Sequence, residues 1–161
     1  MARTAPDSVS RVAIVGTGTI GASWCTYFLA RGMAVAAYDP MAGAEARTRG
    51  FVERAWRDLE ALGLVRDGAG PDALSFAASL EDAVAEAEFI QENGPEDQAK
   101  KGALFAAIDA ACPPETIIAS STSALVMSPI QAHCARPERC VNAHPFNPPH
   151  LMPLVEVSGG D

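Results

Sequence analysis

The chain has 161 residues, of which 48% are hydrophobic and 20% charged, and its formal net charge is −8. This composition is typical of one soluble globular domain rather than of a disordered or membrane-spanning chain. The basic residues are scattered and outnumbered by acidic ones, so a phosphate backbone would find no basic stripe to bind. We therefore expect no nucleic-acid partner.

The cysteines show neither CxxC spacing nor the density of a disulfide scaffold, and the three histidines complete no zinc pattern. We therefore expect reduced thiols, a cytoplasmic protein and no metal site. Residues 1–10 contain no apolar stretch long enough for a signal peptide or a membrane span, so we expect no membrane partner and interpret them as a short flexible tail.

Strand-like and helix-like segments alternate from residue 11 to the end, which is typical of a mainly parallel sheet with helices on both faces. We predict an α/β fold of the Rossmann-type, doubly wound class for residues 11–161. The expected strands lie at residues 11–16, 33–39, 73–76, 88–93, 115–123 and 139–144. The expected helices lie at residues 19–32, 40–64, 79–87, 95–111 and 128–134.

Capping residues set the expected helix boundaries. Gly32 and Gly63 stand where the first two helices should stop. Ser79 should open the third helix, with Asp82 at its third position. Pro95 is a residue favoured in the first helical turn and should begin the fourth helix.

The first two expected helices each carry an apolar face that should contact the sheet. In the first helix the predicted core residues are Ile20, Trp24 and Phe28. In the second they are Phe51, Trp56, Leu59 and Leu62.

The stretch "GTGTIG" follows the first expected strand and opens a helix. Its glycines have the spacing of a dinucleotide-binding loop: Gly16 permits a tight turn, Gly18 lets backbone N–H groups approach a pyrophosphate, and Gly21 lets helix and strand pack closely. Thr19 and Ile20 complete this loop at the helix N-terminus, which favours an anion, so we expect them to contact the cofactor too.

Asp39 ends the next strand, 18 residues after Gly21. A carboxylate there would accept hydrogen bonds from the adenosine ribose hydroxyls and repel a 2′-phosphate, so NAD is favoured over NADP. The nearest downstream arginine is Arg47, which is too distant in sequence to reverse this preference. The alternative is that the glycines serve only a structural turn and that Asp39 merely ends a strand.

A histidine and a glutamate lie twelve residues apart in "NAHPFNPPHLMPLVEV". His144 ends the last expected strand, where ligands bind in open parallel sheets, and a histidine that titrates near neutrality suits proton removal from an alcohol. Glu156 has apolar neighbours, so we expect a partly desolvated carboxylate that orients the imidazole. The alternative is that His144 caps a strand and Glu156 points to solvent.

Four stretches of the chain resemble, in this order, the NAD-binding domain of the 3-hydroxyacyl-CoA dehydrogenase family. They are "VAIVGTGTIG", "QENGPE", "SSTSAL" and "HPFNPPHLMPLVEV". The resemblance implies an NAD-dependent dehydrogenase in which His144 is the catalytic base and Glu156 its partner. It also implies that Ser123 touches both substrate and nicotinamide.

Further cofactor contacts follow from the same resemblance. It implies that Asn147, three residues after the histidine, helps to hold NAD. Glu96 and Lys101 in "PEDQAK" match two more cofactor-contacting positions of the family.

Within the family, this chain looks most like the bacterial branch that oxidises L-carnitine, because it contains "GASW" and "FVERAWRDLEALGL". The branch that oxidises L-gulonate is the next most similar. Members of the family that act on acyl-CoA have a lysine in the segment after the second strand, which meets the CoA phosphates. This chain has no lysine before Lys100. We therefore expect a small free 3-hydroxy acid as substrate, with 3-hydroxybutyryl-CoA, L-gulonate and a non-catalytic NAD-binding module as alternatives.

Family members continue beyond the "VEVSGG" position into a helical domain that covers the substrate and dimerises. The resemblance therefore implies that these residues are the cofactor-binding half of a longer enzyme, which forms a homodimer when the helical domain is present.

Overall fold

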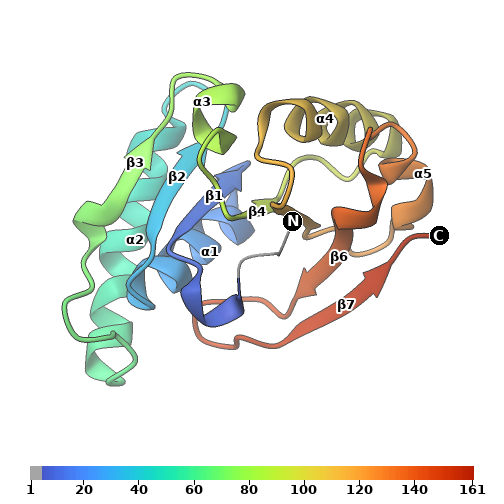
Figure 1. Cartoon of the computed structure of the whole chain (residues 1–161). Helices are drawn as coiled ribbons and strands as arrows, with labels where there is room; N and C mark the ends of the chain where they lie inside the picture. Colours follow the sequence, from blue (N-terminus) through green and yellow to red (C-terminus); the bar gives the residue numbers. More distant parts are fainter. Residues whose placement is uncertain (1–4) are drawn as a thin grey trace.

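Seven strands form one sheet in the order β3-β2-β1-β4-β5-β6-β7 (Figure 1). The computed structural model describes residues 5–161. Strands β1 to β6 are mutually parallel, and β7 runs antiparallel to β6. The strands are β1 Arg11–Val15, β2 Ala34–Tyr38, β3 Leu74–Phe76, β4 Phe89–Glu92, β5 Ile117–Ser120, β6 Cys140–Pro145 and β7 Val155–Gly159. The predicted Rossmann-type, doubly wound sheet is confirmed.

Helices cover both faces of this sheet (Figure 1). The α-helices are α1 Thr19–Ala30, α2 Ala44–Ala61, α3 Leu80–Val84, α4 Gln98–Ala111 and α5 Met127–Gln131. Three short 3-10 turns are η1 Pro6–Ser8, η2 Pro71–Ala73 and η3 Pro137–Arg139. The strand order reverses between β1 and β4, and in such sheets ligands bind at the carboxyl ends of the strands beside this reversal.

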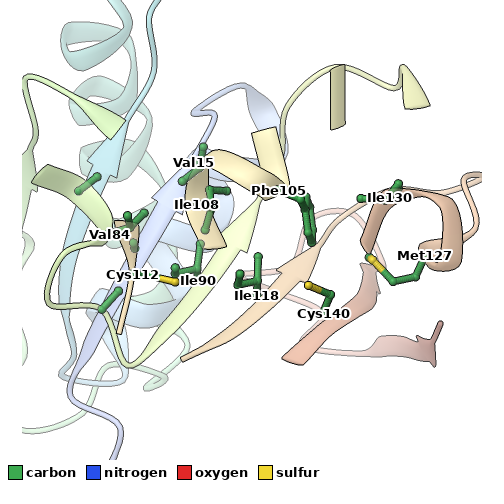
Figure 2. Close-up of a cluster of buried hydrophobic side chains, with 13 residues drawn as sticks. Val15, Val84, Ile90, Phe105, Ile108, Cys112, Ile118, Met127, Ile130 and Cys140 are labelled. Carbon is green, nitrogen blue, oxygen red and sulfur yellow. The ribbon is translucent and has the colours of Figure 1, made fainter. Parts of the chain in front are cut away.

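The core is divided by β1, whose side chains alternate between two apolar clusters. Val12 and Ile14 contact α1 and α2, whereas Ala13 and Val15 contact the cluster under α3, α4 and α5. In the cluster under α3, α4 and α5 (Figure 2), the α4 side chains lie over β4 and β5. Its labelled members are Val15, Val84, Ile90, Phe105, Ile108, Cys112, Ile118, Met127, Ile130 and Cys140.

The predicted core residues of the first two helices are confirmed in part, because Ile20 and Phe28 are only partly buried against the core and Phe51 is also only partly buried. Trp24, Trp56 and Leu59 are buried. Leu62 is 61% exposed, so its prediction as a core residue is wrong. It follows the last residue of α2 and stands at the C-cap, where the helical face no longer continues.

The capping residues act largely as expected. Gly32 and Gly63 follow the ends of α1 and α2 with φ of 81° and 67°, a left-handed conformation that glycine adopts without a Cβ penalty. The Ser79 hydroxyl accepts a hydrogen bond from the backbone N–H of Asp82 at 3.1 Å. These residues therefore end α1 and α2 and begin α3.

The starts of two helices differ from the prediction. Helix α4 begins at Gln98 rather than at Pro95, because Asp97 caps it by accepting a hydrogen bond from the Lys100 N–H at 3.0 Å. Helix α2 begins at Ala44, because residues 40–43 form a turn after the second strand. In both places the chain after a strand makes a loop before it turns helical.

The two ends of the described chain are hydrogen-bonded to the domain. Ser10 and Arg11 donate their backbone N–H groups to the Glu88 carboxylate at 2.6 and 3.0 Å. Part of the expected N-terminal tail, residues 1–4, lies outside the described residues. Near the other end, Gly159 pairs with Val141 in the β6–β7 ladder. Among residues 5–161, no helix combines the length and apolarity needed to cross a membrane.

Candidate active site

The glycine-rich turn between β1 and α1 is packed against the start of the β4–α4 loop. Gly16 has φ of 86°, and a Cβ built on it would lie 2.9 Å from the carbonyl carbon and oxygen of Asn93. A Cβ on Gly21 would collide with the carbonyl oxygen of Gly16. A Cβ on Gly18 would meet no atom within 4 Å, so this position is open to solvent and to a ligand.

Asp39 stands directly after β2 and beside the same turn. Its Oδ2 accepts hydrogen bonds from the backbone N–H of Thr17 at 2.7 Å and from the Thr17 hydroxyl at 3.2 Å. Its Oδ1 accepts the N–H of Met41 at 2.9 Å. The structure therefore brings the acidic residue and the glycine-rich turn together, as the sequence pattern predicts.

A cavity of about 470 Å³ lies between the glycine-rich turn and α2. The turn contributes Thr17, Gly18 and Thr19, and α2 contributes Arg47 and Arg54. Neither arginine is among the site residues predicted from the sequence. They are seven residues apart and so share one helical face, but this spacing points to a site only once α2 is known to lie beside the turn.

His144 and Glu156 lie opposite each other in the β6–β7 ladder, and β6 and β7 run side by side in Figure 1. The imidazole Nδ1 is 3.0 Å from the carboxylate Oε2. Within the described residues, no hydrogen bond reaches the other ring nitrogen, Nε2. A carboxylate on one ring nitrogen fixes the tautomer and leaves the second nitrogen to exchange a proton.

The expected desolvation of Glu156 is wrong, because its side chain is 69% exposed. Strand β7 lies at the edge of the sheet, and the apolar neighbours in sequence point to the opposite face. The pairing with His144 therefore results from strand register and not from burial of the carboxylate.

The loop after β5 places Ser123 on the wall of a second cavity, of about 380 Å³, which His144 and Glu156 also line. The Ser123 side chain is exposed. The three residues that the family resemblance assigns to catalysis thus share one cavity at the carboxyl ends of β5 and β6.

Glu96 holds the Ser123 loop in place. Its Oε1 accepts hydrogen bonds from the Thr122 hydroxyl, the Ser123 N–H at 3.0 Å and the Ala124 N–H at 3.1 Å. Partial burial by itself would raise the pKa of the Glu96 carboxyl, but the bonds from Thr122 and from these backbone groups lower that pKa below its ordinary value. The carboxylate therefore stays ionised and bound to the loop.

Lys101 and Asn147 are not brought into these cavities. Lys101 is 1% exposed, and its ammonium is bound to Glu92 and to the Gly94 carbonyl, so its contact with the cofactor stays a prediction. It lies on the inner face of α4 and so points into the domain. Asn147 is exposed and forms no side-chain hydrogen bond within the described residues.

His150 is buried away from His144 and holds the β6–β7 loop against α1. The Ser23 hydroxyl lies 2.7 Å from the His150 Nδ1 and accepts the backbone N–H of His150 at 3.1 Å. The imidazole also makes an edge-to-face contact with Phe51. His150 therefore fixes the loop that leads to Glu156.

Residues 11–161 match the profile of the family described as "3-hydroxyacyl-CoA dehydrogenase, NAD binding domain". The chain is 52% identical over 158 residues to L-carnitine dehydrogenase of Streptomyces coelicolor, with 98% of this chain and 49% of that protein covered. It is 46% identical over 153 residues to L-carnitine dehydrogenase of Pseudomonas aeruginosa, with 95% and 47% covered. The chain therefore spans about half the length of these curated relatives.

Two solved structures have the same fold as this chain. One is the 5-dehydrogenase of 5-formyl-3-hydroxy-2-methylpyridine 4-carboxylic acid, an NAD⁺-dependent dismutase, with 38% identity and a TM-score of 0.86 over 95% of this chain and 50% of that one. The other is 3-hydroxybutyryl-CoA dehydrogenase from Escherichia coli, with 30% identity and a TM-score of 0.84 over 93% and 32%. The chain belongs to the 3-hydroxyacyl-CoA dehydrogenase family, and residues 11–161 are an NAD-binding domain of that family.

Proposed function

We propose that this domain is the cofactor-binding half of an NAD-dependent enzyme that oxidises the hydroxyl group of L-carnitine to the ketone of 3-dehydrocarnitine. The observation that carries the proposal is the His144–Glu156 pair, with Nδ1 3.0 Å from Oε2, in a cavity that Ser123 also lines. The identity of about half of all positions with L-carnitine dehydrogenases supports the choice of substrate.

In the proposed reaction, His144 Nε2 takes the proton of the substrate hydroxyl while the carbon–oxygen double bond forms. Glu156 holds Nδ1 and stabilises the imidazolium that results. Ser123 donates a hydrogen bond to the substrate oxygen and orients it toward Nε2. NAD, when bound, supplies the acceptor for the hydride that leaves the same carbon.

The proposed NAD site lies along the carboxyl ends of β1 and β2. The N–H groups of the glycine-rich turn and the N-terminus of α1 would bind the pyrophosphate. Asp39 would accept the ribose hydroxyls and disfavour a 2′-phosphate. The exposed amide of Asn147 is free to bind the cofactor from the β6–β7 loop.

A homodimer formed through a following helical half is part of the same proposal, as is a cytoplasmic location. An apolar cavity of about 480 Å³ lies between α1 and the strands β4 to β7, and Val155 and Val157 line it. Leu151, Met152 and Leu154 nearby are exposed. Exposed apolar surface of this kind supports a packing partner in the longer protein.

A CoA thioester such as 3-hydroxybutyryl-CoA is the second candidate substrate. The specific observation in its favour is the pair Arg47 and Arg54, which line the cavity beside the glycine-rich turn. Guanidinium groups bind phosphate well, so two arginines at this place suit a nucleotide-bearing substrate.

Two measurements test the proposal. Calorimetry on this chain should detect NAD binding that is tighter than NADP binding and that Asp39→Ala weakens, whereas Asp67→Ala, at an exposed loop position, should leave it unchanged. Steady-state oxidation by the full-length protein should then be compared on L-carnitine, L-gulonate and 3-hydroxybutyryl-CoA. Faster oxidation of L-gulonate or 3-hydroxybutyryl-CoA than of L-carnitine would overturn the proposed substrate. NAD binding without oxidation of any of the three compounds would indicate a non-catalytic module.

A further inference from the structure

The hydroxyl group of Ser121 makes three hydrogen bonds at the carboxyl ends of β4 and β5. Its Oγ accepts the indole N–H of Trp24 at 3.2 Å and a side-chain N–H of Gln91 at 2.8 Å, and it donates to the Asn93 Oδ1 at 2.7 Å. A hydroxyl group has one proton and two lone pairs, so all of its bonding capacity is used. Three segments that are distant in the sequence therefore meet at one oxygen atom.

Trp24 and Gln91 determine the direction of the Ser121 proton. Both side chains are buried, and each presents an N–H donor to the hydroxyl oxygen. Because these donors occupy both lone pairs, the proton of Ser121 points to the Asn93 Oδ1. The amide of Asn93 is fixed in turn, since its Nδ2 donates to the carbonyl of Gln91 at 3.0 Å.

Asn93 lies directly against the glycine-rich turn. A Cβ on Gly16 would lie 2.9 Å from the carbonyl of Asn93, and a Cβ on Gly21 would lie 3.4 Å from the Asn93 Nδ2. The backbone N–H of Asn93 also donates to the carbonyl of Val15 at 2.7 Å, at the end of β1. The position of Asn93 therefore limits where the turn can lie.

The same hydrogen bonds reach the two segments that carry the proposed catalytic residues. Ser121 stands two residues before Ser123, in the loop that follows β5. The Gln91 Nε2 also donates to the carbonyl of Ala143 at 3.4 Å, and Ala143 directly precedes His144. One set of polar groups thus connects the glycine-rich turn with the Ser123 loop and with β6.

The energetics of these bonds favour a positioning role. Each bond replaces a bond to water, so the net gain in folding free energy is small. A buried group that loses its partner is costly, however, so arrangements in which Ser121 or Asn93 moves away are disfavoured. A fully satisfied network of this kind therefore selects one geometry more than it adds stability.

We propose that Ser121 is a positioning residue that acts through Asn93 and holds the glycine-rich turn and the Ser123 loop in the relative geometry that binds NAD. This inference rests on the proposed function, because the NAD site is the one proposed above. It adds to that function a group that sets the distance between the two halves of the site.

The test is NAD calorimetry on Ser121→Thr and Ser121→Val, with folding of each variant verified by circular dichroism. The two new side chains have the same shape, and only threonine keeps the hydroxyl group. Ser121→Val should bind NAD about tenfold more weakly than Ser121→Thr, which is the usual effect of losing one hydrogen bond. Equal NAD binding by the two variants would overturn the proposal.

Ser75 provides the matched control for this pair of substitutions. Its hydroxyl group donates to the carbonyl of Val35 at 3.2 Å, and it lies on β3 at the opposite edge of the sheet from β7. Ser75→Thr and Ser75→Val should therefore bind NAD equally. A difference as large as that between the Ser121 variants would show that loss of any such hydroxyl weakens binding, against the proposal.

Action through Asn93 predicts effects that do not add. Asn93→Ala alone should weaken NAD binding about tenfold, and Ser121→Val in the same chain should weaken it little further, because the two residues act as one unit. Additive losses, about a hundredfold in total, would mean that Ser121 affects the cofactor by another route.

Trp24→Phe keeps the test decisive where Ser121→Val does not fold. The variant keeps an aromatic ring in the core and removes the indole N–H, so one lone pair of Ser121 is freed and its proton is no longer directed to Asn93. NAD binding should weaken about threefold, which is less than the loss expected for Ser121→Val. Unchanged binding by folded Trp24→Phe would contradict the positioning role.

Nuclear magnetic resonance separates positioning from simple support of the fold. Relative to Ser121→Thr, Ser121→Val should shift the side-chain amide resonances of Asn93 and the backbone amide resonance of Gly16, but not that of Gly63 after α2. An unchanged Gly16 resonance would show that Ser121 does not position the turn. Absence of NAD binding by the folded wild type would instead overturn the proposed function.

Discussion

His144 and Glu156 are a cross-strand pair at the edge of the sheet, with the imidazole Nδ1 3.0 Å from the carboxylate Oε2. Antiparallel pairing of β6 with β7 places the two side chains on the same face of the sheet. Since β7 is the edge strand, the carboxylate keeps its contact with water and still orients the ring. Strand register therefore determines which nitrogen of His144 faces the cavity.

This pairing predicts unequal effects for the two residues on turnover. His144→Gln removes the proposed base, so kcat of the full-length enzyme should fall about 10²–10⁴-fold. Glu156→Gln should lower kcat by about tenfold only, because the amide still accepts a hydrogen bond and water screens the exposed site. Steady-state kinetics with L-carnitine measure both effects, and calorimetry should give an unchanged NAD affinity. A larger loss from Glu156→Gln than from His144→Gln would contradict these roles.

The glycine-rich turn predicts that two similar substitutions will have opposite consequences. Gly18→Ala adds a Cβ that meets no protein atom within 4 Å, so stability should change by less than about 1 kcal/mol, whereas NAD binding should weaken at least about tenfold. Gly21→Ala forces a methyl group against the Gly16 carbonyl and should destabilise the fold by about 1–3 kcal/mol. Thermal unfolding and NAD calorimetry on the two variants separate these effects.

Equal loss of stability in the two glycine variants would mean that Gly18 also has a packing role. Gly63→Ala provides the control, because this residue has a positive φ but lies far from the turn in sequence, after α2. It should lower stability modestly and leave NAD binding unchanged.

Local patterns in the sequence were sufficient to predict the six parallel strands and the proximity of Asp39 to the glycine-rich turn, but not the antiparallel strand β7. The apolar run of β1, the spacing of Gly16, Gly18 and Gly21, and an acid at the end of β2 can all be read directly from the sequence. The assignment of His144, Glu156 and Ser123 required the family resemblance as well.

Features that depend on packing between distant segments were not predictable in this way. The direction of Lys101 is one example, because its ammonium points from α4 to the buried carboxylate of Glu92 on β4. Likewise, Arg47 and Arg54 reach the glycine-rich turn only because α2 is packed beside α1. The exposure of Glu156 follows from the edge position of β7, which apolar neighbours in the sequence do not reveal.

The buried histidine of the β6–β7 loop predicts a pH dependence of stability. Desolvation lowers the pKa of His150 below its ordinary value of 6.5, although the Asp58 carboxylate partly opposes this shift. Below pH 6.5 the unfolded chain therefore takes up a proton that the folded chain does not, so the free energy of unfolding falls as pH falls toward the folded-state pKa. One such group changes this free energy by at most about 1.4 kcal/mol per pH unit.

Urea unfolding between pH 7.5 and 5.5 tests the role of His150. The wild type should lose stability over this range, and His150→Gln should lose less, because its side chain does not titrate. His133→Gln, at an exposed histidine, should follow the wild-type curve. The carboxyl groups with lowered pKa, Glu88, Glu96 and Asp109, reduce stability only at lower pH, where they begin to take up protons in the unfolded chain. An identical slope in the wild type and His150→Gln would show that the contact with Ser23 survives protonation of the ring.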